Sequence, residues 1–241
     1  MIKYLIAMST MLVSVMAFSG ASDDNEINID QAGDTLTLYI DQVGYGNKVG
    51  GDDFSTSSSA SAITGSDLTF DIDQVGNSNL LFGTIEADSS TYNLIWTGDS
   101  NSWDWNIGAS SNNADDMDMD VSITGSSNAM DLDIAGSAAA NNLNFDLSQS
   151  TGDSNQYDVD INSANAKWDW TVVGGSNSIT TSQLDSTGHT MIVSWTGTSG
   201  VANFTQSSGT CSGITSCNGY IDLELNSNNA NVTIVQKDTG D

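Results

Sequence analysis

Apolar and polar residues alternate through most of the chain after residue 25, in short runs separated by glycine-rich corners. The clearest example is the stretch 68–85, LTFDIDQVGNSNLLFGTI, in which every second residue on either side of the corner 75–78 is apolar or an amide. Successive side chains of a strand point to opposite sides, so this alternation predicts two half-buried strands joined by a tight turn. Gln74 and Asn79 are then expected to face inward on either side of the bend.

The same unit recurs, because a glycine three residues before an asparagine appears at intervals of 22 to 32 residues between successive asparagines. A period in this range is typical of repeat architectures, in which each unit stacks on its neighbours. We therefore predict an all-β protein, a β-solenoid of about eight strand–turn–strand coils. The expected corner residues are Gln42, Gly44, Asn47, Gln74, Gly76, Asn79, Gly98, Asn101, Gly125, Asn128, Gly152, Asn155, Gly174 and Asn177, with further corners at Gly200/Asn203 and Asn228/Asn231.

The asparagines have two interpretations. Equivalent residues of stacked coils lie about 4.8 Å apart, so a buried Asn at each corner could donate and accept hydrogen bonds along the stack, as a ladder. Alternatively, Asn is there because it favours turns. The phase of the alternation places these residues on the inward face and favours the ladder.

The domain organisation expected from the sequence is a signal peptide at residues 1–21 and one solenoid domain at residues 22–241. Lys3, an apolar run from Tyr4 to Phe18 and the small residues 19–21 are typical of a secretory signal. The run is shorter than the roughly 20 residues of a membrane span. We therefore expect a secreted protein, extracellular or at the cell surface, with no membrane span after cleavage. Within the solenoid domain, residues 50–66 are rich in Ser and Ala without alternation, which predicts a loop.

The chain carries 31 acidic and only 4 basic residues, a net charge of -27. This excess argues against a nucleic-acid partner, whose phosphates it would repel. Many aspartates occupy outward positions, where stacking would bring them together. Two interpretations stay open: a solvated face that keeps the protein soluble, or weak Ca²⁺ sites, with Asp131, Asp133, Asp158 and Asp160 as candidates. No other cofactor is expected.

No catalytic set is found in the sequence. His189 is the only histidine, and the abundant carboxylates are explained better by regular stacking than by acid–base chemistry. The pairs Trp103/Trp105 and Trp168/Trp170 share the inward phase, which favours a place in the core over an exposed sugar-binding strip. Cys211 and Cys217 flank a short loop and are expected to form a disulfide in an exported chain. We therefore predict a protein that is not an enzyme.

Two corners, Gln42-x-Gly44-x-x-Asn47 and Gln74-x-Gly76-x-x-Asn79, resemble the curlin repeat, the building unit of bacterial curli fibres. Later corners depart from this pattern, with Trp96, Ile123 and Val172 at the glutamine position. The resemblance implies a secreted subunit that self-assembles, with copies of itself or a related curlin-like nucleator, into amyloid-type extracellular fibres or matrix, in a role such as surface adhesion or biofilm formation. The alternative is a monomeric, acidic, capped solenoid that acts as a surface adhesin or Ca²⁺-dependent binding module.

Overall fold

The computed structural model describes residues 25–27, 29–44, 47–50, 61–76, 79–108, 114–135, 140–184, 188–208 and 219–238. These residues form strands and corners without any helix, so none of them offers a helix long and apolar enough to cross a membrane. The expected signal peptide and the two cysteines lie outside the described residues.

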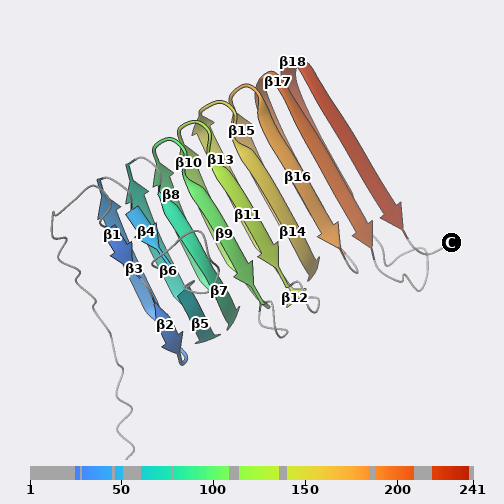
Figure 1. The fold of residues 1–241 in the computed structure, drawn as a ribbon. Coiled ribbons are helices and arrows are strands. Elements are labelled where there is room, and N and C mark those ends of the chain that lie inside the picture. Colours follow the sequence, from blue (N-terminus) through green and yellow to red (C-terminus); the bar gives the residue numbers. More distant parts are fainter. Residues whose placement is uncertain are drawn as a thin grey trace, which may run out of the picture.

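The strands follow one another in regular succession (Figure 1). Their bounds are β1 (Asn25–Ile27), β2 (Asp30–Ala32), β3 (Thr37–Val43), β4 (Asn47–Val49), β5 (Ser61–Ser66), β6 (Thr69–Val75), β7 (Leu80–Asp88), β8 (Thr91–Thr97), β9 (Ser102–Ile107), β10 (Asp118–Thr124), β11 (Ala129–Ile134), β12 (Ala140–Asn141), β13 (Asn144–Thr151), β14 (Gln156–Ala164), β15 (Lys167–Val173), β16 (Asn177–Leu184), β17 (Thr190–Ser208) and β18 (Tyr220–Asp238).

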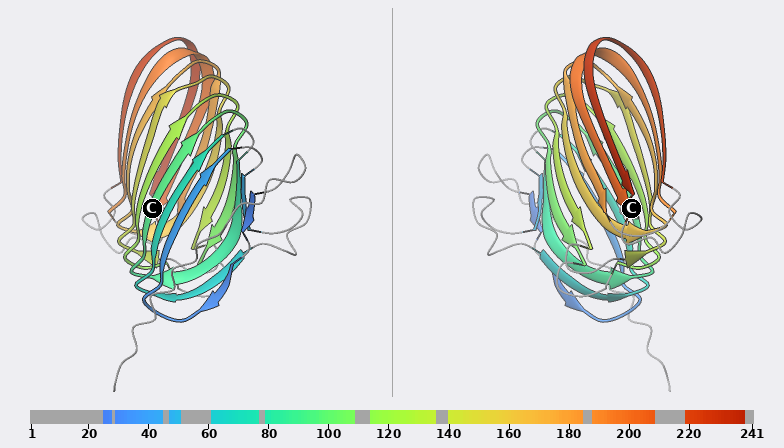
Figure 2. Two further views of the ribbon diagram at one scale, coloured as in Figure 1. Left: turned by 90° about the vertical axis from the view of Figure 1, so that its left-hand side faces the viewer. Right: turned by 90° about the vertical axis from the view of Figure 1, so that its right-hand side faces the viewer.

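All pairings between these strands are parallel, and they form two ladders. The first ladder contains β3, β6, β8, β10, β13 and β15, followed by the first halves of β17 and β18. The second contains β1–β2, β4–β5, β7, β9, β11–β12, β14 and β16, followed by the second halves of β17 and β18. Viewed along the stack, the two ladders curve toward each other and meet at an arch (Figure 2). The predicted all-β solenoid is confirmed.

Fewer coils than the expected eight have the strand–turn–strand form. Among the described residues, six coils supply the two ladders with separate strands on either side of a corner. In the last two coils, β17 and β18 each run through the corner as a single strand of 19 residues. The reason is that ladder pairing continues at the corner, where Gly197 and Thr198 pair with Ser227 and Asn228.

The expected loop at residues 50–66 is wrong for part of its length. Residues 61–66 form β5, which pairs with β2 and β7, while residues 51–60 lie outside the described part of the chain. Ile63 is the only large apolar side chain of β5 and it is buried, so the strand contributes to the core with a single residue. One apolar residue gives no alternating pattern, so the sequence alone does not indicate this strand.

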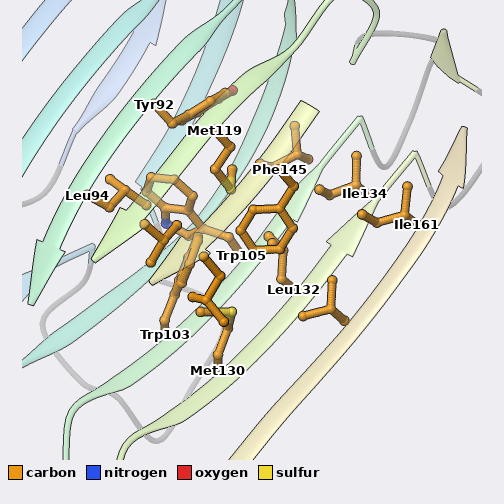
Figure 3. Packing of buried hydrophobic residues seen from close by; sticks show 14 of the residues in the cluster. Tyr92, Leu94, Trp103, Trp105, Met119, Met130, Leu132, Ile134, Phe145 and Ile161 are labelled. Atoms are coloured by element: carbon orange, nitrogen blue, oxygen red, sulfur yellow. The ribbon is translucent and has the colours of Figure 1, made fainter. Parts of the chain in front are cut away.

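A continuous apolar core runs between the two ladders (Figure 3). All four paired tryptophans belong to it, as their phase predicted, and Trp103, Trp168 and Trp170 are at most 1% exposed. Aromatic rings of neighbouring coils pack on one another: the Phe70 and Tyr92 rings stack with centroids 4.7 Å apart. An extra residue before Gly152 shifts the pairing register between β10 and β13, as a β-bulge would.

Candidate functional site

Equivalent residues of successive coils lie one above another and form columns along the stack. A terminal coil lies at each end. The expected corner glycines form the first of these columns. Gly44, Gly76, Gly98, Gly125, Gly152 and Gly174 have φ angles between 126° and 148°. A Cβ on Gly125 would overlap the carbonyl oxygen of Gly98 in the preceding coil. Only glycine satisfies both the backbone angle and the close approach.

The corner asparagines form a second column on the inward side of the glycines. Asn47, Asn79, Asn101, Asn128, Asn155 and Asn177 are at most 1% exposed. The main-chain N–H of Asn79 donates to Oδ1 of Asn101 (2.9 Å), and that of Asn101 donates to Oδ1 of Asn128 (3.0 Å). The same bond links Asn128 to Asn155 and Asn155 to Asn177.

The side-chain amides bond within a corner or to an adjacent coil. Asn155 Nδ2 donates to the Gly125 carbonyl of the preceding corner at 3.3 Å, while other amides donate within their own corner. Asn101 Nδ2 donates to the carbonyl of Gly98 at 3.0 Å, and Asn177 Nδ2 donates to that of Gly174 at 3.1 Å. The ladder is therefore built of side-chain to main-chain bonds rather than of amides stacked on amides. An amide suits this position because its acceptor oxygen and donor nitrogen are separate atoms, so it can accept from one coil and donate to a corner carbonyl in another direction.

Two of the expected corners are in the wrong register. Asn177 pairs with Gly200, so Gly200 occupies the asparagine position of its coil, and Gly197 stacks on Gly174. Asn203 pairs with Thr180 instead and lies between the buried Ala202 and Phe204, which places it on the outward face. Asn231 likewise pairs with Val201 and is exposed, so Asn228/Asn231 is not a corner of this type. The spacing of Gly and Asn does not by itself show whether an asparagine faces inward. That depends on whether its neighbours along the strand are buried or exposed.

Glutamines form short columns near the two ends of the stack. Gln74 Nε2 donates to Gln42 Oε1 at 2.9 Å, both residues belonging to the expected corners. A column that the sequence reasoning missed lies in the second ladder, where Gln206 Nε2 donates to Gln183 Oε1 (2.9 Å) and Gln236 Nε2 donates to Gln206 Oε1 (3.0 Å). In each column the amide of the later coil donates to the earlier one.

The sequence reasoning also missed the residue before each corner asparagine. Ser100, Ser127, Ser154 and Ser176 have φ angles of 55° to 62°, a conformation that is uncommon for residues other than glycine. The signal was present, since each of these corners reads Gly-x-Ser-Asn. The second residue of this motif also links neighbouring corners, because Asp99 Oδ1 accepts a hydrogen bond from the Ser126 N–H of the next corner at 2.7 Å.

The four candidate calcium ligands lie in two adjacent outward rows of the second ladder. Asp131 pairs with Asp104 on one side and with Asp158 on the other, and Asp133 pairs with Asp160. A further row of Asp120, Asp146 and Asp169 runs along the first ladder. Other aspartates are paired with amides, as in the bond from Asn93 Nδ2 to Asp71 Oδ1 at 2.9 Å. Repulsion is thus concentrated in a few rows.

Two of the candidate calcium ligands, Asp131 and Asp160, have raised pKa values. Partial burial, followed by the charges of Asp104, Asp133, Asp158 and Asp160, raises the pKa of Asp131 above its ordinary value of 3.8. Burial and then the charges of Asp158 and Asp133 raise the pKa of Asp160. Both carboxyl groups therefore bind a proton more readily in the folded chain than in the unfolded chain. Over the part of the chain that the structure covers, no three acidic, His or Cys side chains form a group suited to a metal ion.

The two ends of the stack differ from its middle (Figure 2). Among the described strands, β18 pairs only with β17, while β3 pairs only with β6. In the part of the chain that the structure describes, the apolar residues that contact the core without being fully buried belong to the terminal coils. They are Ile27, Ile29, Leu36 and Leu38 at one end, and Ile221, Leu223, Ala230 and Val232 at the other.

Exposed apolar side chains also gather on these terminal strands. Ile234 of β18 pairs with the buried Phe204 and is itself 48% exposed, whereas Tyr39 and Val43 lie on the outward face of β3 and are 61% and 70% exposed. A large exposed apolar surface usually marks a binding site, so the two ends are the candidate functional surfaces of this chain.

Comparison with family models, with curated proteins and with solved structures gave no match.

Proposed function

We propose that the chain is a secreted, curlin-like structural subunit that assembles end to end into amyloid-type extracellular fibres or matrix, where it serves surface adhesion or biofilm formation. The terminal coils carry this proposal. Strand edges that pair on one side only present N–H and C=O groups that can bind a further strand. The partly buried apolar residues beside these edges add a hydrophobic gain when another copy covers them.

The interior of the stack supports the same proposal. The glycine, asparagine and glutamine columns all contain bonds between one coil and the next. A copy added at an end in the same orientation continues such columns without a new kind of contact. Parallel coils stacked about 4.8 Å apart are also the spacing of cross-β fibres.

The exterior favours a structural role over a catalytic one, and we propose that the chain is not an enzyme. His189 is buried at the corner before β17, away from the aspartate rows of the two outward faces. The outward rows repeat the same residue types from coil to coil instead of gathering different types at one place. A surface of this kind suits lateral contacts and solubility.

The aspartate rows are expected to control when assembly occurs. At neutral pH and low salt, the net charge of -27 makes copies repel one another. Acid protonates the rows, and salt or divalent cations screen them, so either change is expected to accelerate assembly. Ca²⁺ acts in this proposal by screening, and specific coordination by Asp131, Asp133, Asp158 and Asp160 is not required.

Fibre formation by the chain from Ser22 to Asp241 tests this function. We would compare it with Val232→Lys, which places a cation on the inward side of the terminal coil, and with Ser178→Lys, which adds the same charge to an outward position of an interior coil. Assembly is followed by light scattering and electron microscopy, with circular dichroism as the test of folding.

The proposal expects fibres from the parent chain and from Ser178→Lys, and folded monomers from Val232→Lys. If the parent chain stays monomeric at every pH, salt and Ca²⁺ concentration, the fibre function is wrong and the monomeric adhesin becomes the better account. If Val232→Lys assembles as fast as Ser178→Lys, assembly does not use the ends of the stack.

A further inference from the structure

The two ends of the solenoid are not flat. At the N-terminal end, the second ladder begins with β1–β2, one position before β4–β5, whereas the first ladder begins with β3. At the C-terminal end, β18 supplies the last strand of both ladders. Among the described strands, the N-terminal end therefore projects by one strand on the second ladder only, and the C-terminal end shows no matching recess.

We propose that copies of this chain join through the second ladder alone, with residues 25–32 of one copy lying parallel to residues 230–237 of the next. This proposal rests on the proposed end-to-end assembly and specifies how the two ends meet. Asp30 of one copy then lies beside Val235 of the other, and Gln31 lies beside Gln236.

The register follows from the ladder itself. Asp30 pairs with Ala62, Ala62 with Thr84, and the same row continues strand by strand to Thr205 and Val235. A copy added in this register repeats the strand pairing that adjacent coils of the second ladder already show. A slip by one residue would turn the inward residues of β1–β2 to the outside.

The glutamine column fits this register in position and in direction. Gln236 Nε2 donates to Gln206 Oε1 of the preceding coil and to the Gly219 carbonyl, both within one chain. The next residue of the column across the joint is Gln31, whose side-chain amide can donate to Gln236 Oε1. The bond would repeat the orientation seen between Gln206 and Gln183.

The apolar and charged residues of the two strands are also compatible with this register. Ile27 falls beside Val232 and Ile29 beside Ile234, so partly covered apolar residues of both ends become covered together. Asp30 meets the uncharged Val235. Like charges on neighbouring strands repel one another, and this row avoids such a contact.

A joint through the first ladder is the alternative, with the first half of β18 placed directly on β3. The rows then set Glu224 beside Asp41, a contact between like charges. The same placement puts residues 230–237 into the position that β1–β2 occupy. The two joints exclude each other, and in the proposed one β3 and β18 stay one strand apart, about 10 Å.

Disulfide cross-linking between copies distinguishes the two joints. Single cysteines are introduced into the chain carrying Cys211→Ser and Cys217→Ser, and differently substituted chains are mixed, assembled and oxidised. The proposed joint is tested by Asp30→Cys mixed with Val235→Cys, and the alternative by Asp41→Cys mixed with Glu224→Cys. A shifted control mixes Asp30→Cys with Thr233→Cys, whose Cα atoms would lie about 8 Å apart, beyond the roughly 7 Å that a disulfide can span.

We expect covalent heterodimers from Asp30→Cys with Val235→Cys, and none above background from the other two mixtures. Heterodimers from Asp41→Cys with Glu224→Cys, or equal yields from the shifted control, would overturn the joint while leaving fibre formation intact. Fibres that form with no heterodimer in any mixture would also overturn it. Absence of fibres from the parent chain refutes the proposed function instead, so the two failures are separable.

Discussion

Replacing Asn101 with alanine tests the asparagine column, because this residue bonds both to its own corner and to the coil before it. Its Oδ1 accepts the buried N–H of Asn79 at 2.9 Å, and its Nδ2 donates to the carbonyl of Gly98 at 3.0 Å. Alanine removes both partners. Each of the two orphaned buried groups costs about 1–3 kcal/mol, so we expect a loss of about 2–6 kcal/mol in the free energy of unfolding.

Asn203→Ala is the matched control. Asn203 also stands three residues after a glycine, but it lies on the outward face of β17. Surface substitutions usually change stability by less than about 0.5 kcal/mol.

Urea unfolding of the monomer, followed by tryptophan fluorescence, measures both variants. With a slope of about 2 kcal/mol per M, Asn101→Ala should lower the midpoint by about 1 M or more, while Asn203→Ala should leave it almost unchanged. Equal shifts for the two variants would refute the reasoning, since sequence spacing rather than ladder register would then decide the role of an asparagine. A shift for Asn101→Ala below 0.3 M would refute the bonded column itself, because that value corresponds to only about 0.6 kcal/mol.

Three further predictions concern the glycine column, the core and the aspartate rows. Gly125→Ala should prevent folding or lower the urea midpoint strongly, because its Cβ overlaps the Gly98 carbonyl, whereas Ser122→Ala on the exposed face should not. Trp170→Ala should cost about 3–5 kcal/mol in unfolding experiments, as expected for a large buried aromatic residue. Lowering the pH from 7 toward 4 should raise the urea midpoint, since folded-state pKa values above 3.8 make the folded chain bind more protons, and Asp131→Asn should reduce this gain. A midpoint that falls steadily over that pH range would contradict the last prediction.

The strands could be predicted from the sequence because each coil obeys a local rule. Residues 68–85 alternate without interruption, and the inward set that includes Phe70, Ile72 and Leu81 is buried in the structure. In a solenoid every coil repeats the same environment, so one clear copy explains the others. The inward phase of Trp168 and Trp170 was predicted by the same reasoning.

The last coils and the end surfaces could not be predicted in this way. Gly200 and Asn203 have the spacing of a corner, and only pairing with Asn177 reveals that Gly200 stands at the asparagine position. The projection of β1–β2 at the N-terminal end depends on which strand of each ladder has no outer neighbour. This is a property of the whole stack and not of any local segment. β5 was missed because Ile63 alone marks its inward face.

Oriented X-ray diffraction from fibres grown from the folded chain tests the central claim most directly. The account predicts a meridional reflection near 4.8 Å, with tryptophan fluorescence as blue-shifted in the fibres as in the monomer, because stacking coils adds rungs without opening the core. Fibres without this reflection, or fibres that show it only with the tryptophans exposed, would mean that the chain unfolds to assemble, and would contradict a solenoid that grows by its ends.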